Sequence, residues 1–152
     1  MDLLILVLQG IIVAATPLAF AAIGELIVEK SGVINLGVEG MMVLGAIAGF
    51  GVTLNTGSYV AGIVAAALAG ASAAALFAIL TQVLISNQVA TGLALTIFGL
   101  GLSALLGQGY SGQSTEPLPV IAIPVLSNIP ILGQILFVHD SLVYLSVFIV
   151  AG

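Results

Sequence analysis

The sequence predicts an all-α protein, a polytopic bundle of transmembrane helices, and three observations carry this prediction. Hydrophobic residues make up 61% of the chain and charged residues only 5%, whereas soluble domains carry about 25% charged residues. The mean hydropathy is +1.38. Uncharged stretches long enough to cross a bilayer, which takes about 20 apolar residues in a helix, follow one another along the chain. We therefore expect about four to five membrane spans.

The first two expected spans differ in character. Residues 3–24 carry no charge and are long enough to cross the bilayer, but Pro17 is expected to interrupt the helix, with Thr16 hydrogen-bonding near the break. Residues 36–54 form a shorter segment than residues 3–24, and this segment is rich in glycine. A short segment interrupted by glycine, beside polar residues, is typical of the broken helices that line transport sites.

The third and fourth expected spans are built for close packing. In residues 59–84 alanine and glycine recur every four positions, and in residues 89–106 glycine and serine do the same. Small residues at this spacing let helix backbones approach one another closely in lipid. Both segments are therefore expected to pack against other helices.

Residues 108–138 are expected to form a loop outside the bilayer core. They hold most of the prolines, and proline at this density excludes a plain spanning helix. A short interfacial helix is expected near residues 129–137. A fifth span is expected to start at Ser141, and because too few residues follow it to cross a bilayer, we expect the N-terminal portion of a longer polypeptide.

The chain's charges suggest an orientation in the membrane. Lys30 is the only basic residue, and basic residues favour the cytoplasmic side. With Lys30 inside, Tyr59, Tyr110 and Tyr144 all fall at the outer interface, where tyrosine is enriched. We therefore expect the N-terminus and the loop 108–138 to lie outside.

Four charged side chains gather around the junction of the first two spans: Glu25, Glu29, Lys30 and Glu39. Glu29 and Lys30 are expected to be solvated, as charges beside a span usually are. Glu25 and Glu39 adjoin apolar runs, where carboxylates usually face a bundle interior. For these two, a role in packing or in a transport pathway stays open beside the solvated alternative.

The same segment contains signals for a break between two helices. Ser31 and Gly32 are typical of a helix end, with glycine in the left-handed conformation. Asn35 is expected to cap a helix that starts at Leu36, which places Glu39 in the first turn, near the positive end of the helix dipole. Asn87 and Gln88, at the start of the fourth span, are expected either to cap that helix or to line a pathway.

Several kinds of chemistry are excluded or weakly supported. One basic residue leaves no surface for nucleic acid, the only lysine lies outside any Walker A pattern, and no residues have metal-ligand spacing. No cofactor is expected. Residues 109–112 match a short Gly-x-Ser-Gly pattern, and Ser111 with the only histidine, His139, is the one pair suited to acyl chemistry. The pattern is short enough to arise by chance, and His139 is expected to be an interfacial residue at a helix start.

Two blocks of the sequence resemble a known family. Residues 16–42, above all the stretch Ser31-Gly-Val-Ile-Asn-Leu-Gly-Val-Glu-Gly-Met41, and residues 87–95 are similar to the permease subunits of bacterial ABC importers in the ribose, nucleoside and branched-chain amino acid superfamily. The similarity is greatest to the simple-sugar and nucleoside permeases. The residues that carry this signature are Glu25, Asn35, Gly37, Glu39 and Gly40.

The resemblance implies the membrane-spanning subunit of an ATP-driven nucleoside importer in the bacterial cytoplasmic membrane, with a simple sugar as the alternative substrate. It implies a second permease subunit, two ABC ATPase subunits that hydrolyse ATP, and an external substrate-binding lipoprotein. The chain itself is then no enzyme. An ATPase-independent transporter is the rival, but it would keep ionisable residues in mid-span, where this chain has none. A scaffold that only packs against other helices is the structural alternative.

Overall fold

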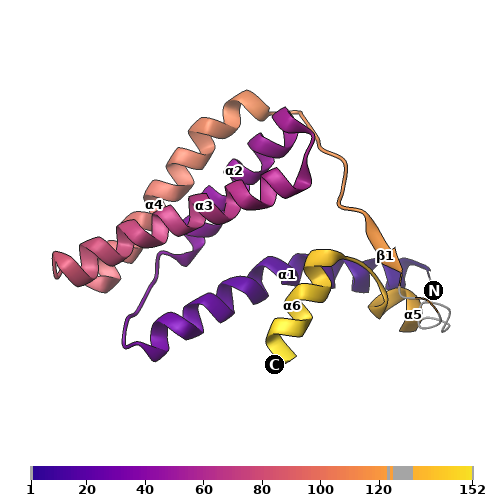
Figure 1. The fold of residues 1–152 in the computed structure, drawn as a ribbon, viewed down its shortest axis with the longest axis horizontal. Helices are drawn as coiled ribbons and strands as arrows, with labels where there is room; N and C mark the ends of the chain where they lie inside the picture. Colours follow the sequence, from indigo (N-terminus) through magenta and orange to yellow (C-terminus); the bar gives the residue numbers. More distant parts are fainter. Residues whose placement is uncertain (1, 123, 125–131, 152) are drawn as a thin grey trace. The chain divides into compact units, whose positions relative to one another are not determined.

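The computed structural model describes all residues except 1, 123, 125–131 and 152 (Figure 1). The longer helices are α1 (Asp2–Lys30), α2 (Val38–Thr56), α3 (Tyr59–Ala78), α4 (Gln88–Gly107) and α6 (Ser141–Ala151). The shorter elements are the π-helical turn η1 (Ile79–Val83), the 3-10 turn η2 (Gln108–Tyr110), helix α5 (Leu132–Leu136), and strands β1 (Val120–Ala122) and β2 (Val138–Asp140).

Among the described residues, four helical segments are long and apolar enough to cross a membrane. They are Leu3–Lys30, Val38–Thr56, Tyr59–Val83 and Gln88–Tyr110, while Ser141–Ala151 is a shorter apolar helix. Large apolar side chains are exposed along all of these helices except Val38–Thr56, as expected of surfaces that face lipid. The prediction of a mostly helical membrane protein is confirmed.

The described chain divides into two compact units. The helical unit comprises Glu25–Glu116, and the split unit comprises Met1–Gly24 with Pro117–Gly152. Helix α1 contributes its first 23 described residues, Asp2–Gly24, to the split unit and its last turns to the helical unit. The residues of the family signature all belong to the helical unit.

Helices α2, α3 and α4 form the helical unit, with α2 packed against both of the others (Figure 1). Small residues make the contact between α2 and α3. A Cβ atom added to Gly49 would lie 3.1 Å from the carbonyl oxygen of Gly62, and one added to Gly45 would lie 3.1 Å from that of Ala66. The alanine and glycine stripe of the third span therefore serves close helix packing, as its spacing predicts.

Helix α1 differs from its expected form in two ways. It continues through Pro17 without a break, so the predicted interruption is wrong. Proline removes one backbone donor, and a neighbouring hydroxyl can take part in the local bonding; here Thr16 Oγ1 donates to the carbonyl oxygen of Ile12 at 3.0 Å. The helix also extends past Gly24 to Lys30, so Glu25 and Glu29 are helical residues.

The end of α1 follows the predicted stop signal. Gly32 has a φ of +83°, in the left-handed region that favours glycine. The peptide N–H of Gly32 donates to the carbonyl of Glu29 at 2.9 Å, and that of Val33 donates to the carbonyl of Val28 at 3.3 Å. These two bonds form a Schellman motif, which closes the helix and satisfies its last carbonyls.

The turn between α3 and α4 is tight and strained. Helix α3 ends in the π-helical turn η1, and Ile85 follows with a φ of +53°. A β-branched residue in this region is an outlier. Ser86 secures the turn, because its hydroxyl contacts both the carbonyl of Leu80 at 2.7 Å and the hydroxyl of Thr91 at 2.9 Å.

The split unit contains a small antiparallel sheet that the sequence did not predict. Strand β1 pairs with β2 in a register that places Ile121 opposite His139. Helix α5 lies inside the range 129–137 expected for a short helix, of which residues 129–131 fall outside the described residues. The region 108–138 is thus a loop with short elements of its own.

Candidate functional site

The signature residues meet at the connection between α1 and α2. We call residues 31–37 the α1–α2 link. Its backbone is irregular, so its N–H and C=O groups need partners from elsewhere. Glu25, Asn35, Gly37 and Gln88 lie in or against this link, and Gly40 lies against α4 just after it. Glu39 and Asn87 do not contact the link by any hydrogen bond among the described residues.

Side chains from α1 and α4 bind the backbone of the link. The peptide N–H of Asn35 donates to Glu25 Oε1 at 3.0 Å, and that of Ile34 donates to Gln88 Oε1 at 2.9 Å. The hydroxyl of Thr96 donates to the carbonyl oxygen of Leu36 at 3.0 Å. The link is therefore tied to one helix before it and to a helix that comes much later in the sequence.

Asn35 organises the link from within. Its side chain is buried, with 6% of its surface exposed. Its Oδ1 accepts a hydrogen bond from the peptide N–H of Gly37 at 2.9 Å, and its Nδ2 lies 3.6 Å from the sulfur of Met41. The bond to Gly37 is an Asx turn, a local turn closed by the side chain itself.

The expected capping role of Asn35 is wrong. Helix α2 begins at Val38 rather than at Leu36, and its N-cap is Gly37, which provides no side-chain bond. Because the carboxamide of Asn35 closes a turn two residues ahead, the helix can start only after that turn. Glu39 does lie in the first turn of α2, as predicted.

Glycines let the start of α2 touch α4 backbone to backbone. A Cβ atom on Gly40 would lie 2.6 Å from the carbonyl oxygen of Leu95, and one on Gly99 would lie 2.6 Å from that of Gly40. A Cβ atom on Gly92 would lie 2.8 Å from the peptide nitrogen of Leu36. No real side chain fits at these distances, so the link and α4 form one close contact.

Glu25 has one satisfied oxygen and one that is not. Its Oε1 accepts the bond from Asn35, but its Oε2 is buried and lacks a hydrogen-bond partner in the described part of the chain. The residue as a whole is half-buried. Glu25 Oε2 is the only buried side-chain N or O atom without a hydrogen-bond partner among the residues described.

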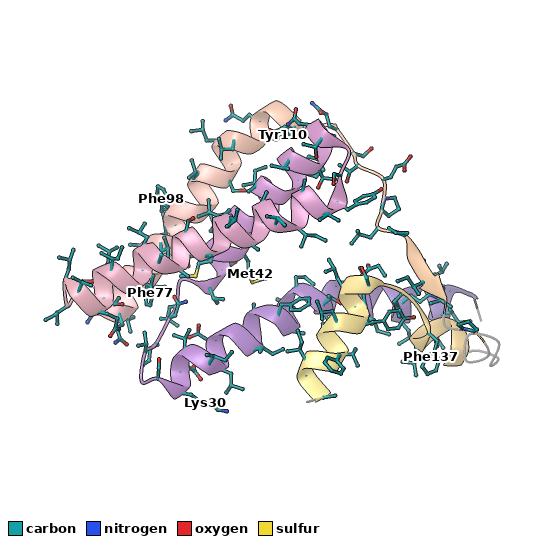
Figure 2. The ribbon with its side chains drawn as sticks, viewed as in Figure 1. Lys30, Met42, Phe77, Phe98, Tyr110 and Phe137 are labelled. Carbon is teal, nitrogen blue, oxygen red and sulfur yellow. The ribbon has the colours of Figure 1, made fainter. Side chains whose placement is uncertain are left out.

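The remaining charged and polar candidates have simpler surroundings. Glu29, Lys30 and Glu39 are exposed, and Lys30 ends α1 with its side chain directed away from the helix (Figure 2). Asn87 is the N-cap of α4, and its Oδ1 accepts from the peptide N–H of Ala90 at 3.0 Å. Of the two alternatives for Asn87, its geometry is that of a cap.

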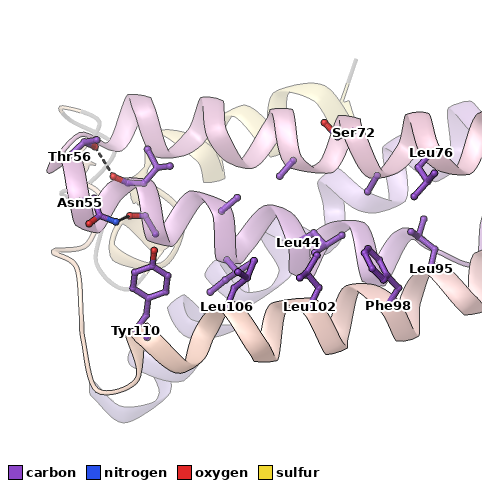
Figure 3. Close-up of a pocket in the computed structure, with 17 residues that line it drawn as sticks. Leu44, Asn55, Thr56, Ser72, Leu76, Leu95, Phe98, Leu102, Leu106 and Tyr110 are labelled. Atoms are coloured by element: carbon purple, nitrogen blue, oxygen red, sulfur yellow. Dashed lines mark hydrogen bonds between the residues drawn. The ribbon is translucent and has the colours of Figure 1, made fainter.

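A large groove lies between α2, α3 and α4, and the sequence analysis did not identify it. Its volume is about 820 Å³, and its walls are mainly apolar. Leu95, Phe98, Leu102 and Leu106 line it along α4 (Figure 3). Their helical spacing was the available signal. Polar side chains occur at one end of the groove: Asn55, Thr56 and Tyr110.

The residues that matched a protease pattern have other roles. Ser111 is exposed in the turn after η2. His139 is 4% exposed, with Nε2 2.6 Å from the carbonyl oxygen of Ile135, and its peptide N–H donates to the hydroxyl of Tyr144 at 3.3 Å. His139 thus lies beside the start of α6 with its ring buried and bonded to the backbone, and its place at the membrane interface stays a prediction.

The family described as "Branched-chain amino acid transport system / permease component" matches residues 7–151 of the sequence. The chain belongs to this permease family. The match includes both units and every residue of the signature. It confirms the resemblance, and it identifies a multi-pass membrane protein that is not itself an enzyme.

Three curated proteins of this kind are similar to the chain. The "Putative glucose ABC transporter permease protein" of Haloferax volcanii is 41% identical over 91% of this permease and 44% of the relative. The nucleoside ABC transporter permease of Lactococcus lactis is 30% identical over 90% and 46%, and the guanosine ABC transporter permease of Bacillus subtilis is 29% identical over 99% and 50%. The permease thus spans about half the length of these relatives. No solved structure matches it.

Proposed function

We propose that the chain is a membrane-spanning subunit of an ATP-driven importer for a neutral solute that contains a sugar ring. The observation that carries the proposal is the family match over residues 7–151. The absence of a Walker A pattern from the sequence agrees with it, since ATP is then bound by other subunits. The uncharged mid-span regions also agree, because ion-coupled transport needs ionisable groups there.

Two substrates are supported by different observations. Two of the relatives carry a nucleoside or guanosine in their names, and these support a nucleoside. The relative with the higher identity carries glucose in its name, which favours a simple sugar. We propose a nucleoside as the substrate and a simple sugar as the second candidate; both present hydroxylated rings without net charge.

The proposed assembly contains a second permease subunit, ABC ATPase subunits and an external substrate-binding lipoprotein. We place it in the cytoplasmic membrane of a bacterium. Within this assembly Glu25 and Glu39 are the candidates for a role on the transport pathway, because they are the carboxylates next to the start of α2. Asn35, Gly37, Gly40, Asn87 and Gln88 are proposed to support that region.

Uptake measurements test the proposal. Cells that express the importer with its cognate subunits should accumulate radiolabelled nucleoside, and unlabelled nucleoside should compete better than glucose or ribose. Inactivating the phosphate-binding lysine of the ATPase subunit should abolish uptake, because transport is coupled to ATP. Stronger competition by a sugar would make the simple sugar the first candidate and the nucleoside the second. Uptake that survives ATPase inactivation would refute the proposal of an ATP-driven importer.

A matched pair of variants tests the pathway role of Glu39. Glu39→Gln removes the charge and keeps the size, and it should lower uptake if the carboxylate serves the pathway. Glu29→Gln, at an exposed position near the same link, is the control and should leave uptake unchanged. Equal uptake by both variants and the unmodified importer would support the scaffold alternative for Glu39.

A further inference from the structure

The α1–α2 link contains glycine at positions 32 and 37, and this composition predicts a flexible break in the membrane helix. The geometry of the link points to the opposite. We propose that the link is a fixed joint, which fastens the end of α1 and the start of α2 to α4, and that Glu25 and Gln88 are its positioning residues. The inference rests on the proposed function, since it states which part of the permease keeps its shape during transport.

The hydrogen bonds of the link support a fixed joint. In most loops the backbone bonds to water, and the loop is mobile for that reason. Here the N–H groups of Ile34, Asn35 and Gly37 each donate to a side chain, from Gln88, Glu25 and Asn35 in turn. Successive parts of the link are thus held from α4, from α1 and from within.

Packing supports the same conclusion independently. The glycines of α2 and α4 bring the two backbones into direct contact at Gly40 and Gly99, and Gly92 brings α4 against Leu36. A contact between backbones leaves no flexible side chain to absorb a change in spacing. Sliding the start of α2 along α4 would drive each of these glycines into a neighbouring carbonyl or peptide group.

A fixed joint limits how the permease can change between inward-open and outward-open states. The last turn of α1, the link, the first turn of α2 and the first half of α4 should move as one body. Conformational change must then be taken up outside residues 25–41 and 87–99. In this interpretation the start of the short, glycine-rich second span, as far as residue 41, is rigid and does not act as a hinge.

Amide hydrogen exchange on the assembled importer tests the joint. We expect the N–H groups of residues 34, 35 and 37 to exchange slowly, and equally so in the nucleotide-free state and in a vanadate-trapped ATP state. Ser114 and Glu116, exposed in the irregular segment after η2, serve as an internal reference for unprotected backbone. Exchange in the link as fast as in that segment, or protection that differs between the two states, would overturn the proposal.

A variant assigns the protection to a named bond. In Gln88→Ala the N–H of Ile34 loses its acceptor, and its exchange should become about five- to tenfold faster, the effect of losing one hydrogen bond. Gln82→Ala is the matched control, because the exposed side chain of Gln82 bonds, within the described part of the chain, only to the adjacent Thr81. An unchanged exchange rate at Ile34 in Gln88→Ala would show that Gln88 is not a positioning residue of the joint.

Distance measurements with Glu25 and Gln88 unchanged guard against a variant that fails to fold. The sequence has no cysteine, so spin labels attach only where cysteine is introduced. Labels at Ser31→Cys and Val89→Cys, both exposed positions, should give the same distance distribution in the two nucleotide states. A shift between states would refute the joint, while absent uptake with an unshifted distance would refute the proposed function alone.

Discussion

Gly99 and Gly101 of α4 have opposite surroundings, although only one residue separates them. A Cβ atom on Gly99 would lie 2.6 Å from the carbonyl oxygen of Gly40, whereas one on Gly101 meets nothing within 4 Å. Gly99→Ala should therefore lower the free energy of unfolding by about 1–3 kcal/mol through overpacking. Gly101→Ala is the control and should be neutral or stabilising by up to about 1 kcal/mol, since alanine favours helix. Thermal unfolding in detergent measures both, and equal effects would contradict the close contact.

Ile85 offers a second test at the scale of one residue. Its φ of +53° is strained for a β-branched side chain, and 85% of its surface is exposed, so little packing would be lost on substitution. Ile85→Gly should raise stability by about 1 kcal/mol, because glycine adopts this conformation without strain. Leu84, also exposed but with a φ of −88°, provides the control. Leu84→Gly should give no such gain, and a gain of equal size would show that exposure and not strain is responsible.

The start of α4 depends on Asn87. Asn87→Ala should destabilise the permease by about 1 kcal/mol, the usual effect of removing a helix cap. Asn87→Asp keeps the acceptor and adds a charge that the helix dipole favours, so it should preserve stability. Thermal unfolding checks the cap, and uptake checks the alternative that Asn87 lines the transport pathway. An Asn87→Asp protein that is stable but no longer transports would support the pathway role.

The start of α6 gives the matching test in the split unit. Asp140 Oδ1 accepts from the peptide N–H groups of Leu142 and Val143 at 2.9 and 3.0 Å, so it caps this short helix. Asp140→Ala should cost about 1 kcal/mol, and Asp140→Asn should retain most of the stability. Amide exchange at Leu142 and Val143 reports the change directly, and equal exchange in both variants would argue against the cap.

At the scale of elements, the sequence predicts what local chemistry decides. Long apolar runs predict the helices, and Gly32 predicts where α1 ends, because a left-handed residue there is a local requirement. The continuity of α1 through Pro17 was not predictable from the proline rule, since one missing donor is tolerated in a long apolar helix. The strands β1 and β2 pair across the 15 intervening residues 123–137, and such pairing has no local signal.

In the candidate site too, the sequence predicts local features but not the contacts between residues far apart in the chain. The signature locates Asn35 and Gly37 in the sequence, but it does not indicate that Gln88, 54 residues after Ile34, provides the acceptor for that residue's N–H. Glu25 and Asn35 are near enough in sequence for their contact to be a natural expectation once α1 is known to include Glu25. The partnership of Gly40 with Gly99 depends on helix packing, which spacing alone does not assign.

For the molecule as a whole, the orientation in the membrane is the prediction to test. Thr56, at the expected outer end of α2, and Ser31, beside Lys30, are both exposed. In intact cells a membrane-impermeant maleimide should label Thr56→Cys and should label Ser31→Cys only after permeabilisation. The unmodified chain, which lacks cysteine, is the blank. The reverse pattern would place Lys30 outside.

The bond from Thr96 to Leu36 also has a consequence for biogenesis. The two residues are 60 positions apart, so at about 5–20 residues per second the ribosome needs roughly 3–12 s to add the second after the first. Helices α2 and α3 are added during that interval, and the backbone groups of the link lack Gln88 and Thr96 until α4 is made. The link between the first two helices therefore stays unfinished until synthesis reaches the fourth helix.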